Sequence, residues 1–301
     1  MTQQKNNTVF ESALSESATV GERALDVLLP QPAGPEARLM EAMRYAALGG
    51  GKRLRGFLVL QSGSLFGVDR RALERTAASV ECVHAYSLVH DDLPAMDDDD
   101  IRRGKPSTHK QFDEATAILA GDALLTLAFG MISSPDAHGD PFVRCELVAR
   151  LAQAAGHAGM VGGQMMDMAL EGQSPAAHEI TRLQRMKTAA LIAYSCEAGA
   201  ILGKASQQAR MALAAFGTDL GLAFQIADDL LDEEGEAGRV GKATRKDSVR
   251  GKPTAVSMLG NERARAHAEA LAAQASRHLD LFGEKADLLR AAAAFVVVRR
   301  A

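Results

Sequence analysis

Apolar residues recur at steps of three and four along most of the chain, the spacing that gathers side chains on one face of an α-helix. In residues 174–202 this pattern is carried by Ile180, Leu183, Met186, Ala190, Leu191 and Tyr194. Ser174 is a suitable N-cap for that helix, and Pro175 is a suitable first residue. Similar patterns predict helices over 9–29, 36–48, 54–66, 69–93, 112–133, 141–157, 159–170, 206–232, 253–282 and 285–298.

Strand signals are weak by comparison, because β-branched residues seldom alternate with polar ones. Several helical segments, such as 115–129, are apolar on most faces, as expected for helices in the middle of a bundle. The breaks between helices are too short to be interdomain linkers. These features predict an all-α fold: a single domain over residues 1–301, with about ten or more helices around a central core and cavity. Residues 1–8 are expected to be flexible.

Composition excludes several classes of function. A net charge of -4, an aromatic content of 4% and the absence of tryptophan argue against a nucleic-acid-binding surface. The scattered cysteines Cys82, Cys145 and Cys196 indicate a reduced, cytoplasmic protein without a disulfide framework. The first residues lack the apolar segment of a signal peptide. Because no uninterrupted run of about 18 apolar residues occurs, no membrane-spanning helix is expected.

The first stretch that carries chemistry is HDDLPAMDDDDIRRGK, residues 90–105. In a straight helix Asp91 and Asp97 would project about 240° apart. Pro94 disfavours a helical conformation at Leu93, so we expect the chain to leave the helix there and to return Asp97 toward Asp91. The six aspartates of this stretch need compensating positive charge. We expect most of it to come from a bound cation rather than from the stretch itself.

A second acidic motif, DDLLD, occupies residues 228–232. Asp228 and Asp232 are spaced to share one face of a helix, where their charges repel. A solvated helix end is the ordinary interpretation of a single acidic run. Here both runs follow apolar helical segments, and a carboxylate that leaves a buried helix needs a metal or another cation. Carboxylate oxygens suit Mg²⁺, and two such motifs facing each other would form a cavity with two metal-binding walls.

Mg²⁺ usually completes its coordination with water and substrate phosphates, so we expect a phosphate or diphosphate ligand. The basic residues that could bind it are Lys52, Arg53, Arg55, Arg102, Arg103, Lys187, Lys242 and Lys252. Taken singly, each is more often an exposed surface charge. The glycine run before Lys52 is not a P-loop, because it lacks the GxxxxGK[ST] spacing.

Six motifs, in their order and spacing, resemble those of the trans-isoprenyl diphosphate synthases: GGGKRLR, ECVHAYSLVHDDLPAMDDDDIRRGKPSTH, ILAGDALLTLAF, GGQMMDM, KT and FQIADDLLD. The resemblance runs from about residue 36 to the C-terminus and is greatest toward the bacterial farnesyl diphosphate synthases. It implies the all-α isoprenoid-synthase bundle, commonly a homodimer. It also implies that isopentenyl diphosphate is condensed with dimethylallyl or geranyl diphosphate through ionisation, attack on the allylic cation and loss of a proton.

The resemblance also implies roles for individual residues. Mg²⁺, as three ions with substrate bound and with Mn²⁺ able to substitute, would be bound by Asp91, Asp92, Asp97, Asp228, Asp229 and Asp232. The allylic diphosphate would be held by Arg102, Lys187 and Lys242, and Lys252 would also bind substrate. Isopentenyl diphosphate would be held by Lys52, Arg55, His84 and Arg103, although His84 without the resemblance is better explained as a core histidine. Lys187, Thr188 and Gln225 would act at the reacting centre together with Asp91, Asp97 and Asp228. For Asp98, Asp99 and Asp100 two alternatives stay open: they only shape or solvate the loop, or they take part in the site.

Product length is predicted from Tyr86 and Ser87, which lie just over one helical turn before Asp91. An aromatic ring at Tyr86 would stop the growing chain near fifteen carbons, which gives farnesyl diphosphate; geranyl or geranylgeranyl diphosphate is the alternative. Two positions depart from the family pattern. Gly56 stands where proline is usual, and the loop after Asp232 is altered in register.

Three other classes of function are disfavoured by these motifs. A simple acidic, cation-binding helical protein would not need the basic residues. A terpene cyclase would carry a different second metal motif and would lack the basic residues for isopentenyl diphosphate. A non-catalytic subunit of a heteromeric synthase would lose one acidic motif. This chain has both acidic motifs and the basic residues, so a catalytic prenyltransferase is favoured.

Overall fold

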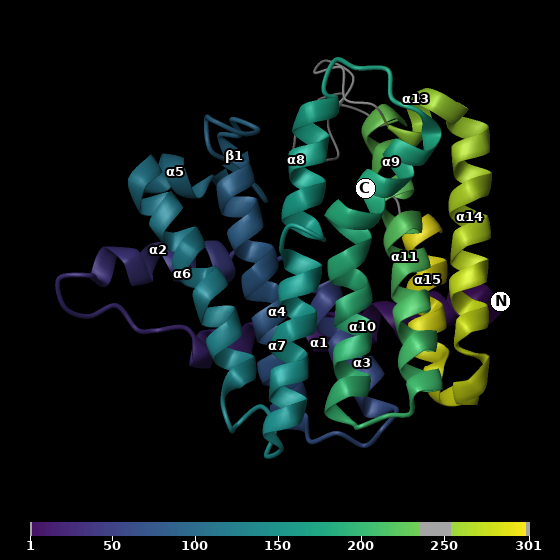
Figure 1. Ribbon diagram of the computed structural model, residues 1–301, viewed down its shortest axis with the longest axis horizontal. Helices are drawn as coiled ribbons and strands as arrows, with labels where there is room; N and C mark the ends of the chain where they lie inside the picture. Colours follow the sequence, from purple (N-terminus) through teal and green to yellow (C-terminus); the bar gives the residue numbers. More distant parts are fainter. Residues whose placement is uncertain (1, 235–253, 299–301) are drawn as a thin grey trace. The chain divides into compact units, whose positions relative to one another are not determined.

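The computed structural model describes residues 2–234 and 254–298, and this part is built of helices with one short hairpin (Figure 1). Its contacts form two compact units that are interleaved in sequence. The N-terminal unit comprises residues 12–60 and 69–148, and the C-terminal unit comprises residues 1–11, 61–68 and 149–301. Helices that contribute residues to both units are α1 (Thr2–Leu28), α3 (Leu54–Ser64) and α7 (Pro141–Ala155). The single domain over residues 1–301 stays a prediction.

The N-terminal unit also contains α2 (Ala37–Ala47), α4 (Arg70–Asp91), β1 (Ile101–Arg102), β2 (Lys105–Pro106), α5 (Thr108–Gln111) and α6 (Glu114–Ser133). Helix α4 is buried along most of its length and packs against α6. At their contact a Cβ on Gly121 would lie 2.1 Å from His90 Nε2, so any larger residue would displace the imidazole. This close approach explains the glycine of ILAGDALLTLAF.

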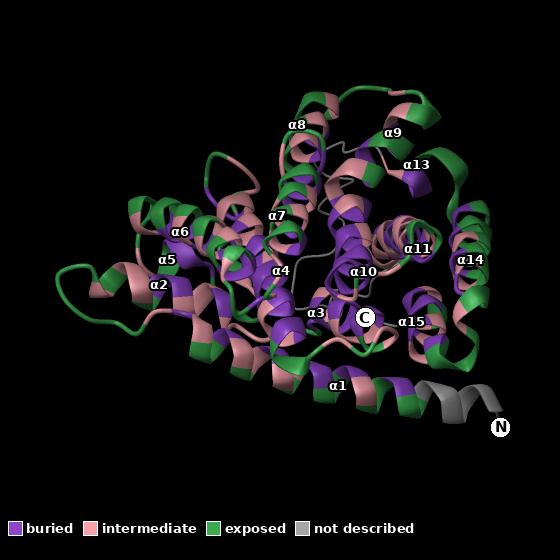
Figure 2. Cartoon of the chain, turned by 60° about the horizontal axis from the view of Figure 1, so that its bottom comes forward, coloured by how far each residue is buried: buried purple, intermediate pink, exposed green. Residues whose placement is uncertain are grey.

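The C-terminal unit contains α8 (Met160–Leu170), α9 (Ala177–Gln184), a π-helix (Arg185–Ala189), α10 (Ala190–Leu202), α11 (Gln207–Glu234), α13 (Ala255–Leu259), α14 (Asn261–His278), a 3₁₀ helix (Asp280–Ala286) and α15 (Asp287–Val298). Helix α11 packs against α10 on one side and α14 on the other (Figure 1). Helix α10 is buried on nearly every face, whereas α14 buries a stripe of alanines (Figure 2). These patterns place α10 and α11 in the core of the unit.

The all-α fold predicted from the periodicity is confirmed, but three local expectations differ from the structure. The helix expected to begin at Ser174 begins at Ala177, where the carboxylate of Glu179 accepts a 2.9 Å hydrogen bond from the N–H of Ala176. It is also interrupted by the π-helix. The helix expected over 253–282 is broken at Gly260, whose φ of +76° is unsuited to an α-helix. The hairpin was missed because each of its strands has only two residues.

Within the described residues, α6 is long and apolar enough to cross a membrane when judged by length and composition alone. The search for uninterrupted apolar runs does not detect this helix, because Asp122 and two threonines interrupt its apolar residues. Core helices of soluble proteins meet the same criterion. Helix α6 packs against α4 and α2, and this packing buries 39% of its apolar window.

Candidate active site

The first acidic stretch closes α4 with a fold-back. The helix ends at Asp91, and the backbone N–H of Asp97 donates to the Asp91 carbonyl oxygen over 2.8 Å. One step further, the N–H of Asp99 donates to the carbonyl oxygen of Asp92 over 3.1 Å. The return of Asp97 toward Asp91, predicted from Pro94, is therefore confirmed. It gathers the acidic residues at the end of a buried helix.

Asp92 is the buried member of this motif, with 2% of its surface exposed. Arg102 on β1 grips its carboxylate: Nε lies 2.9 Å from Oδ1 and 3.1 Å from Oδ2, and Nη2 also donates to Oδ1. Burial alone would lower the pKa of Arg102, but the hydrogen bond and charge of Asp92 outweigh it and raise that pKa. Arg102 Nη2 also reaches Asp99. The expectation that compensation comes mostly from outside the stretch is wrong for Asp92 and Asp99.

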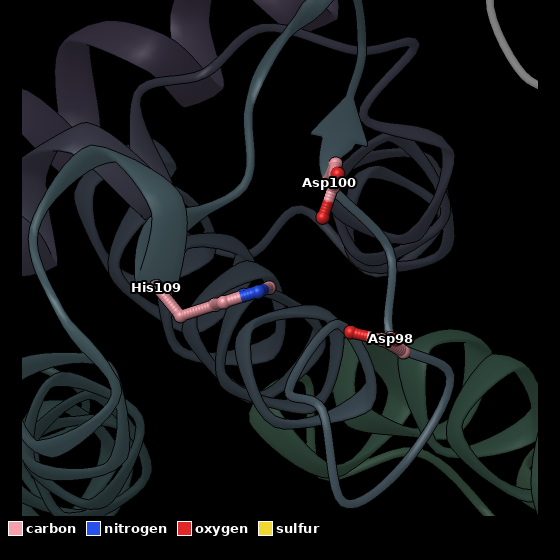
Figure 3. Close-up of side chains that lie close together, drawn as sticks. All are labelled: Asp98, Asp100 and His109. Carbon is pink, nitrogen blue, oxygen red and sulfur yellow. The ribbon is translucent and has the colours of Figure 1, made fainter.

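Figure 3 shows a second group, formed by Asp98 and Asp100 of this loop and His109 of α5, whose possible metal-ligand atoms lie within 4.8 Å of one another. His109 is buried, and its Nδ1 lies 3.1 Å from the hydroxyl oxygen of Ser107. Lys110 places its ammonium 2.9 Å from Asp100, and this hydrogen bond raises the pKa of the lysine. Sequence reasoning gave His109 no role, because the hairpin between Asp100 and His109 has strands of only two residues and leaves no periodic signal. The group includes none of the six aspartates predicted to bind Mg²⁺.

His84 on α4 lies among arginines. Burial, followed by the positive charges of Arg55 and Arg103, holds the pKa of His84 well below its usual value of 6.5. The pKa of Arg103 is itself lowered by burial and by the charge of Arg53. The imidazole is therefore neutral at neutral pH, within a local positive potential that favours an anion.

Arg53 has a structural role beside this group. Its guanidinium is buried and pairs with Glu22 at 2.7 Å and with Glu81 at 3.3 Å. The backbone N–H of Gly56 donates to the other oxygen of Glu81 over 2.9 Å. Proline has no N–H and could not make this bond, so glycine at this position allows the backbone to be tied to Glu81.

The glycine run before Lys52 lets Arg103 lie directly on the backbone. Gly51 has a φ of +110°, and a Cβ there would lie 2.8 Å from Arg103 Cζ. Arg103 also donates to the carbonyl oxygen of Gly50. A pocket next to this contact is lined by residues that include Tyr45, Gly49, Asp92, Arg102, Arg103 and Lys105. The pocket thus carries three basic side chains of the N-terminal unit.

The second acidic motif lies on α11. Asp228 and Asp232 are partly buried and one turn apart, as predicted, whereas Asp229 is only 6% exposed. Two amides hold the Asp229 carboxylate: Gln225 Nε2 lies 2.9 Å from Oδ1, and Gln184 Nε2 lies 3.2 Å from Oδ2. Sequence reasoning gave Gln184 no role, because nothing in its local pattern marks a buried amide.

The π-helix presents two consecutive residues to different neighbours. Lys187 Nζ lies 2.6 Å from Asp167 Oδ2 on α8, and the Thr188 hydroxyl donates to Gln225 Oε1 over 2.6 Å. The contact between Thr188 and Gln225, both predicted at the reacting centre, brings α11 and the π-helix together. Such π-turns are frequent at functional sites. Asp167 belongs to the motif GGQMMDM, but the sequence alone assigns it no role.

Glycines allow the π-helix to be enclosed by its neighbours. A Cβ on Gly163 of α8 would lie 2.2 Å from the backbone nitrogen of Lys187. On the other side, a Cβ on Gly221 of α11 would lie 2.5 Å from the Cα of Ala189. Backbone cannot yield as a flexible side chain can, so these positions exclude any larger residue. This explains the second glycine of GGQMMDM.

Tyr86, the residue predicted to limit product length, is 5% exposed on α4 and meets His90 edge-on, with ring centroids 5.8 Å apart. Burial and then the charge of Asp91 raise the pKa of Tyr86 to about 12, so its phenol stays neutral. Ser87 donates to the carbonyl oxygen of His84 over 3.0 Å. The role of Tyr86 and Ser87 in chain length stays a prediction.

The aspartates differ in how well they fit Mg²⁺. Hard carboxylate oxygens on partly buried residues suit this ion, which describes Asp91, Asp97, Asp228 and Asp232. The carboxylates of Asp92 and Asp229 already accept hydrogen bonds from Arg102, Gln184 and Gln225 on both of their oxygens. Burial and these hydrogen bonds thus distinguish the two aspartates from the other four, and metal binding by any of the six stays a prediction. Lys242 and Lys252 lie outside the described residues.

Comparisons with known proteins agree with this arrangement. A sequence model of one family, described as polyprenyl synthetase, matches residues 36–290. Farnesyl diphosphate synthase of Escherichia coli (strain K12) is 45% identical over 269 residues, which cover 87% of this chain and 89% of that protein. The crystal structure of an FPP/GFPP synthase from Zymomonas mobilis is 47% identical with a TM-score of 0.88, over 97% of this chain and 100% of that one. A geranyltransferase from Helicobacter pylori, complexed with magnesium and isoprenyl diphosphate, is 32% identical with a TM-score of 0.81, over 94% and 96%.

Proposed function

We propose that the chain, which belongs to the polyprenyl synthetase family, is a farnesyl diphosphate synthase that condenses isopentenyl diphosphate with dimethylallyl diphosphate and then with geranyl diphosphate. The allylic C–O bond breaks and diphosphate leaves. The double bond of isopentenyl diphosphate attacks the allylic cation, and transfer of a proton to the released diphosphate completes the new allylic diphosphate. The observation that carries the proposal is the pair of acidic motifs, each with one buried aspartate held by side-chain donors and two partly buried ones suited to metal.

The allylic diphosphate is assigned to the acidic motifs and the cations next to them. Mg²⁺, when bound by Asp91, Asp97, Asp228 and Asp232, would neutralise charge on the departing diphosphate. Arg102 and Lys187 are held in place by Asp92 and Asp167, respectively. Positive groups fixed before substrate arrives require little reorganisation during the reaction. The magnesium in the Helicobacter pylori structure supports the choice of ion. The proposal includes three Mg²⁺ ions bound together with substrate, and Mn²⁺ as an ion that can replace them.

Isopentenyl diphosphate is assigned to Lys52, Arg55, His84 and Arg103. The low pKa of His84 keeps the imidazole neutral, so it offers a hydrogen bond without adding to the repulsion among the arginines. Arg55 and Arg103 supply the charge, and Lys52 is exposed where an incoming anion can reach it. Neutral histidine among cations is the arrangement expected of a site that awaits an anion.

Thr188 and Gln225 are assigned to the reacting centre. The Thr188 proton is committed to Gln225 Oε1, so the lone pairs of the hydroxyl oxygen are available to a developing positive charge. Lys187 beside them offers an ammonium to the leaving diphosphate. The allylic cation would also require an apolar surrounding that excludes water and so prevents its hydrolysis.

Tyr86 is proposed as the floor that stops the product at fifteen carbons. We expect Tyr86→Ala to lengthen the product toward twenty carbons or more, measured by chromatography of the dephosphorylated alcohols. Tyr86→Phe removes only the hydroxyl, keeps the ring and is the matched control. A Tyr86→Ala variant that still stops at fifteen carbons would exclude Tyr86 as the floor.

A longer natural product is the second candidate. The Zymomonas mobilis structure is described as an FPP/GFPP synthase, and relatives at 38% identity include a geranylfarnesyl and a geranylgeranyl diphosphate synthase. The buried phenol of Tyr86 favours the shorter product over these. Product analysis of the wild-type enzyme distinguishes the two directly.

A cytoplasmic homodimer is part of the proposal. Ile118 and Leu119 on α6 are 44% and 57% exposed, which supports a partner covering that helix. Sedimentation or light scattering is expected to give twice the chain mass. Substitution of both residues by lysine is expected to give monomers, and a wild-type monomer would contradict the dimer.

The assay that tests the function uses isopentenyl diphosphate, either allylic diphosphate, and Mg²⁺. We expect farnesyl diphosphate, abolished by EDTA and by Asp91→Ala. Cyclic hydrocarbons would indicate a terpene cyclase, and no product would indicate a non-catalytic subunit.

A further inference from the structure

Four side chains of the C-terminal unit form one directional chain of hydrogen bonds. Thr188 Oγ1 lies 2.6 Å from Gln225 Oε1, Gln225 Nε2 lies 2.9 Å from Asp229 Oδ1, and Gln184 Nε2 lies 3.2 Å from Asp229 Oδ2. Three of the four, Gln184, Thr188 and Asp229, are nine-tenths or more buried. Such a network is held in a medium where each bond counts for more than in water.

The chemistry of the groups fixes every direction in this chain. An ionised carboxylate only accepts, so both glutamines must turn their NH₂ groups toward Asp229. The oxygen of Gln225 must then face Thr188, and the threonine hydroxyl must donate to it. Asp229 and Gln184 thus decide where the proton of Thr188 points, although neither touches it.

We propose that Asp229 is a positioning residue, that Gln184 is its partner, and that the two orient Gln225 and through it Thr188 at the reacting centre. This deepens the proposed function and rests on it. Asp229 then differs in role from Asp228 and Asp232 although it lies between them on α11. A direct bond from Asp229 to Mg²⁺ would place the ion against oxygens that each already accept an amide N–H, so the metal would compete with Gln184 and Gln225 for the charge of this carboxylate.

Gln184→Ala tests this without touching an aspartate. In the full-length enzyme with Mg²⁺ and saturating substrates, kcat is expected to fall about 10- to 100-fold, the range for groups that orient a functional side chain. The KM for geranyl and isopentenyl diphosphates is expected to stay within about twofold. Affinity for Mn²⁺ with pyrophosphate, measured by titration calorimetry, is expected to match wild type.

Two further variants separate positioning from simple damage to α9. Gln184→His keeps an N–H donor of similar reach and is expected to recover most of kcat. Arg182→Ala changes an exposed residue of the same helix and is expected to keep wild-type kcat. Unchanged kcat in Gln184→Ala would overturn the proposal, and so would a loss of Mn²⁺ affinity that matches the loss of kcat, because that would place Asp229 on the metal.

A crystallographic measurement keeps the two proposals distinguishable. If the wild-type enzyme forms no prenyl product, the proposed function fails while the positioning can still be judged. The distance between Thr188 Oγ1 and Gln225 Oε1 is expected to remain near 2.6 Å in wild type and to be lost in Gln184→Ala. The same short distance in both structures would overturn the positioning.

Discussion

The two acidic motifs bury the same member of each aspartate pair but hold it with different chemistry. Asp92 is 2% exposed and is met by the guanidinium of Arg102, a full positive charge on a hairpin strand. Asp229 is 6% exposed and is met by the amides of Gln184 and Gln225, which supply dipoles from two helices. The ion pair anchors a loop, whereas the amides orient neighbouring side chains. The second aspartate of the DD pair therefore stabilises a loop in the N-terminal unit, whereas in the C-terminal unit it positions the side chains of the reacting centre.

The largest expected effect is the loss of kcat when a partly buried aspartate, proposed as a metal ligand, is replaced in either motif. Asp91→Ala and Asp228→Ala are each expected to lower kcat about 10³-fold, because each removes a ligand that stabilises the leaving group. Asp92→Asn and Asp229→Asn are expected to leave affinity for Mn²⁺ with pyrophosphate close to wild type. Steady-state kinetics and calorimetry measure the two quantities. Equal loss of Mn²⁺ affinity in Asp92→Asn and Asp91→Ala would break the comparison.

The next effect is on stability in the first motif. Arg102→Ala leaves the Asp92 carboxylate buried without its cation and is expected to lower the free energy of unfolding by about 3 kcal/mol. Urea denaturation measures it. Arg102→Lys is expected to recover part of the loss, because lysine restores the charge but not the two-pronged geometry. A loss under about 1 kcal/mol for Arg102→Ala would show that the ion pair is not what anchors the loop.

In the second motif the corresponding loss is expected to be smaller. Gln184→Ala removes one amide donor from Asp229 and is expected to lower the free energy of unfolding by about 1 to 2 kcal/mol. The same urea experiment measures it, with Arg182→Ala as the control. A loss as large as that of Arg102→Ala would remove the distinction between charge and dipole.

The smallest expected effect is on the pH dependence of stability, and it involves His84 of the N-terminal unit. His84 has a folded-state pKa well below 6.5, so only the unfolded chain takes up its proton as the pH falls through 6.5. Stability is then lost below that pH, by at most about 1.4 kcal/mol per pH unit from this residue. Unfolding midpoints between pH 7.5 and 5.5 are expected to fall less steeply in His84→Gln than in wild type. Parallel curves would mean that His84 does not titrate in this way.

Features that depend on residues close together in the sequence were predictable from the sequence. The helical periodicity gave the all-α fold, and Pro94 gave the return of Asp97 toward Asp91. Arg102 was predicted to hold substrate, but its grip on Asp92 depends on a hairpin of two-residue strands that leaves no periodic signal. Gln184 was missed for a related reason. Its partner Asp229 lies on another helix, and single-sequence patterns report only neighbours along the chain.

Because of the π-helix Arg185–Ala189, the geometry of this region depends on the number of residues in the segment as well as on their identity. A π-turn contains one more residue than an α-turn, so deletion of a single codon within it would restore a continuous α-helix. The preceding helix would then rotate by about 100° relative to α10, which would turn Gln184 away from Asp229. A chain that had lost only Arg185 would keep all six sequence motifs and still lose the alignment of its reacting centre.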